Sequence, residues 1–393
     1  MSNMRDVSRL DTLIGQSVAA IDTPALVIDL DAMERNLASM QSFAKAHSIM
    51  LRPHAKMHKS AHLALLQMQA GAVGVCVQKV SEAAVLAELG VGDIYVSNVV
   101  TALQKCEQLA LISSQPEGQN ASKTKLAVAA DSLVGIAHLA QAMAQHAPAE
   151  RLDVFVEIDV GQGRCGVSPG EAAVPLVQAI SQSEHLRFAG LQAYHGRAQH
   201  LRSAAERRSA IAGVIEKVQA TKAALQAAGF AVPLVTGAGT GSFIHEAASG
   251  VYGELQAGSY LFMDTDYAAN EPDPAMPRFE HALFVKSQVI SRQTTAGDDR
   301  AVLDAGHKSH AIDSGLPTIW AGHHADWEFF NGGDEHGILR GSSLPEIGDV
   351  VWLIPGHCDP TVNLHDAMIG VRGGLSKGHI ERVIRVDTRG CLT

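Results

Sequence analysis

The chain has 393 residues, of which 46% are hydrophobic and 18% charged, a composition typical of a soluble globular protein. No apolar run approaches the ~18 residues that a membrane helix needs. A formal net charge of −10 without a basic run disfavours nucleic acid as a partner. The length predicts two domains, since a large α/β barrel takes only about 250 residues.

The start of the chain and its cysteines predict a cytoplasmic location. The opening segment, MSNMRDVSRLDTLIGQ, mixes Asp with Arg and lacks the apolar centre of a secretory signal. The five cysteines are odd in number and far apart, and none forms a CxxC pair. This pattern disfavours a disulfide framework and suits a reducing compartment.

Short apolar runs alternate with Ala/Leu-rich stretches of helical spacing along the first two thirds of the chain. Such alternation predicts parallel strands joined by right-handed helical crossovers. Eight units predict a closed (β/α)8 barrel. An open doubly wound sheet is the alternative, disfavoured because no GxGxxG follows the early strands. The eight predicted strands are 49–54, 72–77, 93–98, 125–130, 153–159, 188–194, 232–237 and 254–262.

Beyond about residue 270 the strand-like runs follow one another without long helices, which predicts a mostly β second domain. The early run TPALVIDL (23–30) lies outside the eight units and is expected to pair with this C-terminal sheet. The Pro-rich segment 270–279 is the natural boundary. We therefore predict a barrel over 33–268, and a β domain formed by 1–32 together with 269–393.

The stretch LRPHAKMHKS (51–60) places several basic groups where the first barrel strand ends. Active sites of such barrels lie at the C-terminal ends of the strands. A lysine there can form a Schiff base with an aldehyde cofactor if burial or nearby cations lower the pKa of its amine. Arg52 and the neighbouring histidines are candidates for the positive charges that would lower this pKa. The alternative is a solvated turn with flexible lysines.

Two Gly-rich turns fall where such barrels commonly bind phosphate. GAGTGS (237–242) follows the seventh predicted strand, and AGSY (257–260) lies in the eighth. Backbone N–H groups and hydroxyls in turns of this kind can hold an anion. Without a Walker or Rossmann pattern, the leading ligands are phosphorylated sugars and pyridoxal phosphate.

The segment PGHCDPTVNLHD (355–366) is rich in metal-binding side chains. In an extended segment alternate residues share a face, so His357 and Asp359 would point the same way while Cys358 points away. Such a pair suits Mn²⁺, Mg²⁺ or Zn²⁺, with other positions open to water or substrate. The alternative is a polar turn in which Asp359 precedes Pro360.

Together these segments resemble the metal-dependent D-threonine aldolases, a group of alanine-racemase-like pyridoxal phosphate enzymes. The resemblance rests on DTPALVIDLDAMERN, LRPHAK, CVQKVSEA, VEIDVGQGRCGV, LQAYHGRAQH, TGAGTGS, GVYGELQAGSYLFMDTDY and PGHCDPTVNLHD, in the same order from about residue 20 to the end. It implies an alanine-racemase-type barrel with a C-terminal β domain. It also implies retro-aldol cleavage of D-3-hydroxy amino acids with pyridoxal 5'-phosphate and a divalent metal.

The resemblance also assigns roles to individual residues. Lys56 matches the Schiff-base lysine, Arg164 an arginine beside the cofactor ring, and His200 a candidate base near the metal. His357 and Asp359 match the metal ligands, for which Mn²⁺ fits best by ligand hardness, with Mg²⁺ and Co²⁺ as alternatives. The other residues that match cofactor contacts are Gln78, Tyr194, Thr240, Gly241, Gly258, Ser259 and Tyr267.

Related activities stay open at this point. A D-3-hydroxyaspartate aldolase would need a free cation for the second carboxylate, for which His58, His307 and Lys308 are candidates. In D-serine dehydratases the second metal ligand is a cysteine, so Asp359 disfavours dehydratase activity. A non-catalytic cofactor-binding barrel is disfavoured by the β domain. The resemblance further implies a homodimer in which the β domain of one chain approaches the barrel of the other.

Overall fold

The computed structural model describes residues 7–115, 123–295, 297–320 and 326–393. The first six residues of the opening segment lie outside the described part of the chain. None of the helices in the described ranges has the length and apolar character needed to cross a membrane.

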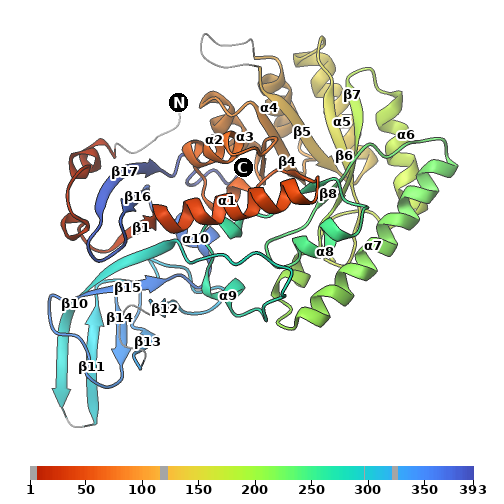
Figure 1. The fold of residues 1–393 in the computed structure, drawn as a ribbon. Helices are drawn as coiled ribbons and strands as arrows, with labels where there is room; N and C mark the ends of the chain where they lie inside the picture. The colour runs from red at the N-terminus through yellow and green to blue at the C-terminus, as the bar shows by residue number, and fades with distance from the viewer. Residues whose placement is uncertain (1–6, 116–122, 296, 321–325) are drawn as a thin grey trace.

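Eight parallel strands among the described residues form the predicted barrel (Figure 1). The sheet runs in the order β2-β9-β8-β7-β6-β5-β4-β3. Its two edges meet where the chain beyond β2 pairs with β3: the Cys76 N–H donates to the Pro53 carbonyl at 2.8 Å. This closure rules out the open doubly wound alternative. The strands are β2 (Met50–Leu51), β3 (Val75–Val77), β4 (Asp93–Val99), β5 (Lys125–Ala130), β6 (Leu152–Glu157), β7 (Leu186–Ala193), β8 (Val235–Gly237) and β9 (Glu254–Leu255).

Helices lie around the outside of the barrel (Figure 1), and most residues of the barrel strands are buried. Strand β3, for example, is buried at every residue, as expected for parallel strands between helices and barrel interior. Side chains cap helix starts: Asp29 accepts from the Ala32 N–H, and Ser132 from the Gly135 N–H. The helices are α1 (Leu30–Ala46), α2 (Ala61–Gln69), α3 (Val80–Glu88), α4 (Leu103–Ser113), α5 (Leu133–His146), α6 (Val174–Gln182), α7 (Ala204–Ala227) and α8 (Phe243–Ala248).

The C-terminal part of the chain forms a mostly β unit, as predicted. Strand β1 (Ala25–Asp29) is inserted between its strands, antiparallel to β10 and parallel to β16. Figure 1 shows this as a red strand lying beside a blue one, and the predicted pairing of the early run is therefore confirmed. The other strands are β10 (Leu283–Thr295), β11 (Asp298–Leu303), β12 (Thr318–Ile319), β13 (Glu328–Asn331), β14 (Gly337–Arg340), β15 (Val350–Ile354), β16 (Ala367–Arg372) and β17 (His379–Arg385).

Two short helices join the β unit to the mouth of the barrel. Helix α9 (Thr265–Ala268) follows the last barrel strand, and helix α10 (Cys358–Val362) follows β15. The buried carboxylate of Asp264 connects them, because it accepts from the Tyr267 N–H and the Cys358 N–H, each at 3.0 Å. The start of α10 is therefore held beside the C-terminal ends of the barrel strands.

Candidate active site

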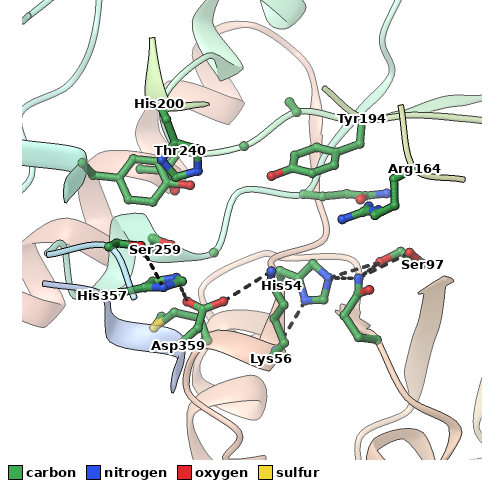
Figure 2. A pocket seen from close by; sticks show the side chains of 18 of the residues that line it. His54, Lys56, Ser97, Arg164, Tyr194, His200, Thr240, Ser259, His357 and Asp359 are labelled. Atoms are coloured by element: carbon green, nitrogen blue, oxygen red, sulfur yellow. Dashed lines mark hydrogen bonds and ion pairs between the residues drawn. The ribbon is translucent and has the colours of Figure 1, made fainter. Parts of the chain in front are cut away.

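A cavity of about 310 Å³ lies at the C-terminal ends of the barrel strands, under the start of α10. Every site residue predicted from the sequence lines it except Gly241. Figure 2 shows Lys56 between two groups of side chains, with His357 and Asp359 on one side and Arg164 and Tyr194 on the other. The predicted lining residues are Lys56, Gln78, Arg164, Tyr194, His200, Thr240, Gly258, Ser259, Tyr267, His357 and Asp359.

Lys56 lies in a 3-10 turn (Ala55–Met57) directly after β2, and its Nζ is 3.4 Å from Asp359 Oδ2. Burial lowers the pKa of the Lys56 amine, but Asp359 and Tyr194 together outweigh burial and the net shift is upward. The prediction that Arg52 helps to lower the pKa of the Lys56 amine is wrong. The Arg52 guanidinium is instead bound to Asp93 at 2.5 Å and to Glu254 at 2.9 Å, within the barrel.

His357 and Asp359 face each other across 3.8 Å, measured from Nε2 to Oδ1. Their alignment arises at a helix start and not in the extended segment that we predicted: His357 directly precedes α10, and Asp359 lies in its first turn. Cys358 points away, as expected. It is fully buried, and its thiol donates to the Met263 carbonyl at 3.4 Å.

The donor atoms of this pair fit one divalent cation. Two ligands that each lie ~2.0–2.2 Å from a shared ion are at most ~4.4 Å apart, which the 3.8 Å separation satisfies. Asp359 Oδ1 is buried and has no hydrogen-bond partner, which is costly for a carboxylate oxygen unless a cation binds it. No three His, Cys, Asp or Glu side chains group into a metal cage in the described ranges. Further ligands of an ion here would therefore be water or substrate.

His200 carries its own carboxylate partner. It ends a 3-10 turn (Gly196–His200) after β7, and its Nδ1 is 2.6 Å from Asp266 Oδ2. Asp266 is buried and is also bound by Arg202. A carboxylate on Nδ1 fixes the proton there and leaves Nε2 as the basic nitrogen. His200, oriented by Asp266, can therefore act as a general base through Nε2.

The two Gly-rich turns meet at the cavity, which residues of both turns line. The Tyr260 N–H donates to Thr240 Oγ1 at 3.0 Å, which joins the turn after β8 to the turn after β9. Gly258 is required, because a Cβ there would lie 2.8 Å from the His54 carbonyl oxygen. Gly241 lies outside the cavity, and its N–H donates to Gln199 at 2.9 Å. The hydroxyls of Thr240 and Ser259 therefore suit a phosphate better than the Gly241 amide does.

A histidine that the sequence analysis considered only as a source of positive charge near Lys56 also lines the cavity. His54 Nε2 lies 2.7 Å from the Gln78 side-chain nitrogen, one of the two positions of that amide, and 3.2 Å from Ser97 Oγ. Burial keeps the pKa of His54 far below its usual value, so the ring is neutral. His54 comes two residues before Lys56, so proximity to the lysine was the signal that could have identified it.

Three carboxylates near the metal pair and the base were also missed. Asp313 Oδ2 is 2.7 Å from His357 Nδ1, Asp264 holds the start of α10, and Asp266 binds His200. Nothing in the local sequence around them marks these contacts. Each one joins segments that meet only in the folded chain.

The cations proposed for a second substrate carboxylate do not line the cavity. His58 is fully buried against Gln67, and burial lowers its pKa to about 4. His307 pairs with Asp334, and Lys308 with Glu335. These three residues therefore provide no charge to the substrate side of the cavity.

The chain matches two family models in tandem. Residues 28–266 match the N-terminal domain of alanine racemase, and residues 282–371 match a serine dehydratase domain. A D-threonine aldolase of an Arthrobacter species is 43% identical over 96% of this chain and 95% of its own. A 3-hydroxy-D-aspartate aldolase of Paracoccus denitrificans is 40% identical over 97% of this chain and 95% of its own.

Solved structures agree with these matches. The crystal structure of a D-threonine aldolase from Filomicrobium marinum superposes with a TM-score of 0.90 at 44% identity, covering 97% of this chain and 99% of the other. A D-threo-3-hydroxyaspartate dehydratase from Delftia has a TM-score of 0.80 at 25% identity over 94% and 98% of the two chains. The chain thus belongs to the D-threonine aldolase family, carbon–carbon lyases built on the pyridoxal-phosphate-binding barrel of the alanine racemases.

Proposed function

We propose that this protein uses pyridoxal phosphate and a divalent metal to cleave D-3-hydroxy amino acids, with D-threonine giving glycine and acetaldehyde. One observation carries the proposal: the Lys56 amine, the His357–Asp359 pair and His200, which Asp266 binds, share one cavity. An amine for the cofactor, a metal and a base for the β-hydroxyl are what a retro-aldol cleavage requires.

The cofactor would be held at both ends. Lys56 provides the amine that binds the aldehyde, and Thr240 and Ser259 provide hydroxyls for the phosphate. Arg164 and Tyr194 line the side of the cavity away from the metal pair (Figure 2). An arginine at the ring nitrogen would disfavour protonation there, which moderates the electron sink that pyridoxal phosphate supplies.

The reacting end would be organised by the two histidines. His357 and Asp359 would hold a divalent metal, whose Lewis acidity lowers the pKa of a bound hydroxyl. His200 accepts the proton of the substrate's β-hydroxyl through Nε2. The Cα–Cβ bond breaks, the aldehyde departs, and a proton added at the α-carbon gives glycine. The Asp266 carboxylate stabilises the imidazolium that forms.

The charges beside the metal pair favour D-threonine over D-3-hydroxyaspartate, since Arg164 lines the other side of the cavity. Beside the metal pair the lining adds a carboxylate, Asp313, which would repel a second substrate carboxylate. The candidate cations His58, His307 and Lys308 lie elsewhere. D-3-hydroxyaspartate stays the second candidate substrate because of the 40% identity to an aldolase named for it. Asp359, in place of a cysteine, disfavours the dehydratase reaction.

Four further parts of the proposal follow from ligand chemistry and family resemblance. We propose Mn²⁺ as the metal, since a carboxylate and an imidazole with water suit it, and Mg²⁺ or Co²⁺ as alternatives. We propose a homodimer and a cytoplasmic location. We also propose that residues 33–268 form the cofactor domain, and that 1–32 with 269–393 form the domain carrying the metal ligands.

Product analysis tests the function. Purified, Mn²⁺-loaded protein would be incubated with D-threonine and with both 3-hydroxy-D-aspartate diastereomers, before and after EDTA. Glycine with acetaldehyde from D-threonine, lost on chelation, is the expected result. Glycine with glyoxylate from hydroxyaspartate alone would move the assignment to the second candidate. Formation of ammonia and a keto acid would refute the proposed aldolase activity.

A further inference from the structure

The loop before β12 approaches the metal pair from the β unit. Its Asp313 places Oδ2 at 2.7 Å from His357 Nδ1, on the side of the ring opposite Asp359. The imidazole is thus placed between two carboxylates, one on each nitrogen. Only the Asp359 side offers a buried oxygen without a hydrogen-bond partner.

We propose that Asp313 is a positioning residue for the metal site: its carboxylate holds the proton of His357 on Nδ1 and directs Nε2 toward the cation shared with Asp359. A histidine can bind a metal only through an unprotonated nitrogen, so the hydrogen bond on the other nitrogen selects the productive tautomer. The same contact fixes the angle of the ring. This inference rests on the proposed function, because it presumes that His357 and Asp359 bind a metal.

The loop that carries Asp313 is held by contacts that do not involve this carboxylate, although Asp313 Oδ2 also accepts from the neighbouring Ser314 hydroxyl at 3.2 Å. The Ala311 N–H donates to Thr361 Oγ1 at 3.0 Å, and the Thr361 hydroxyl donates to the His357 carbonyl at 2.7 Å. The Asp313 side chain is itself 52% exposed. A substitution at Asp313 should therefore leave the fold and the loop in place while it changes the environment of the imidazole.

Without Asp313 the imidazole loses its main restraint. The only other side-chain contact of Nδ1 among the described residues is Ser314 Oγ, at 3.4 Å. The ring could then rotate, or carry its proton on Nε2, where it blocks the metal. Removal of an outer carboxylate of this kind typically weakens metal binding by about 10- to 100-fold. Asn at this position would keep an oxygen acceptor for the Nδ1 proton but lose the charge, so its effect should be intermediate.

The test measures metal binding without substrate turnover. Holoenzyme with cofactor bound would be titrated with Mn²⁺, and free Mn²⁺ would be counted by its electron paramagnetic resonance signal. The variants are Asp313→Ala, Asp313→Asn and, as the matched control, Asp334→Ala, which removes the carboxylate from the surface pair that His307 forms outside the cavity. His357→Ala tests the metal site itself.

We expect Asp313→Ala to weaken Mn²⁺ binding by about 10- to 100-fold, Asp313→Asn by less, and Asp334→Ala not at all. Cofactor absorbance and circular dichroism should stay unchanged in all three. Wild-type affinity in Asp313→Ala would overturn the positioning role while leaving the metal site intact. Wild-type affinity in His357→Ala would instead overturn the metal assignment within the proposed function, so the two failures are distinguishable.

Discussion

Glu246 is a buried acid that supports the Gly-rich turn after β8, and its ionisation should make the protein less stable as pH rises. The side chain lies in α8 and accepts from the Ser242 hydroxyl at 2.8 Å, and Ser242 in turn accepts from Gln199 at 2.8 Å. Its second oxygen is buried without a partner. Burial accordingly raises the pKa of Glu246 from 4.5 to about 7.

The sign and size of the effect follow from proton linkage. The folded protein binds this proton more tightly than the unfolded chain does, so the free energy of unfolding falls as pH rises from about 4.5 through 7. At ~1.36 kcal/mol per pKa unit the whole loss is roughly 3 kcal/mol, of which roughly 2 to 3 kcal/mol falls between pH 5 and 8. Replacing Glu246 by Gln removes the ionisation but keeps an oxygen that accepts from Ser242.

The assay compares urea unfolding at pH 5 and pH 8, followed by circular dichroism, for the wild type and Glu246→Gln. The free energy of unfolding of the variant minus that of the wild type should be roughly 2 to 3 kcal/mol larger at pH 8 than at pH 5. The control is Glu216→Gln on the exposed face of α7, which should keep the wild-type pH dependence. Equal pH dependence in the wild type and Glu246→Gln would refute the reasoning, because all other titrating groups are shared.

The remaining predictions concern the cavity. Lys56→Ala should abolish the visible absorbance of the lysine-bound cofactor, and a retained band that amines can shift would contradict the role of Lys56. Asp359→Cys should shift metal preference from Mn²⁺ toward Zn²⁺, because thiolate is a softer ligand; an unchanged order of affinities would show that Asp359 is not a ligand. His200→Ala should lower kcat by about 10²- to 10⁴-fold with cofactor and metal retained, and Asp266→Asn by less. Near-normal turnover of His200→Ala would place the base elsewhere.

The barrel could be predicted because buried parallel strands leave continuous apolar runs in the sequence. All eight runs correspond to strands, but some are shorter than predicted. The run at 254–262 contributes only Glu254–Leu255 to the sheet. The chain after it turns at Gly258 into a 3-10 turn (Ser259–Leu261), where the Tyr260 N–H bonds to Thr240 instead of to a neighbouring strand. A tertiary contact overrides the local pattern there.

Much of the candidate site could be predicted for a similar reason. Lys56 and the His357–Asp359 pair lie in short segments whose local sequence alone suggests their chemistry. The carboxylates that orient the histidines could not be identified in this way, since Asp313 is 44 residues from His357 in sequence and Asp266 is 66 residues from His200. The expected effect of Arg52 was wrong because its carboxylate partners, Asp93 and Glu254, come from other strands.

The insertion of β1 between β10 and β16 constrains the order in which the protein can fold on the ribosome. Strand β1 is made early, but its neighbour β10 begins at Leu283, about 250 residues after β1 ends at Asp29. At ~5–20 residues per second, β1 waits roughly 10–50 s for a partner. The barrel strands between them emerge in the meantime and need only one another to close. The apolar β1 strand is thus a segment of the nascent chain that needs protection from premature association.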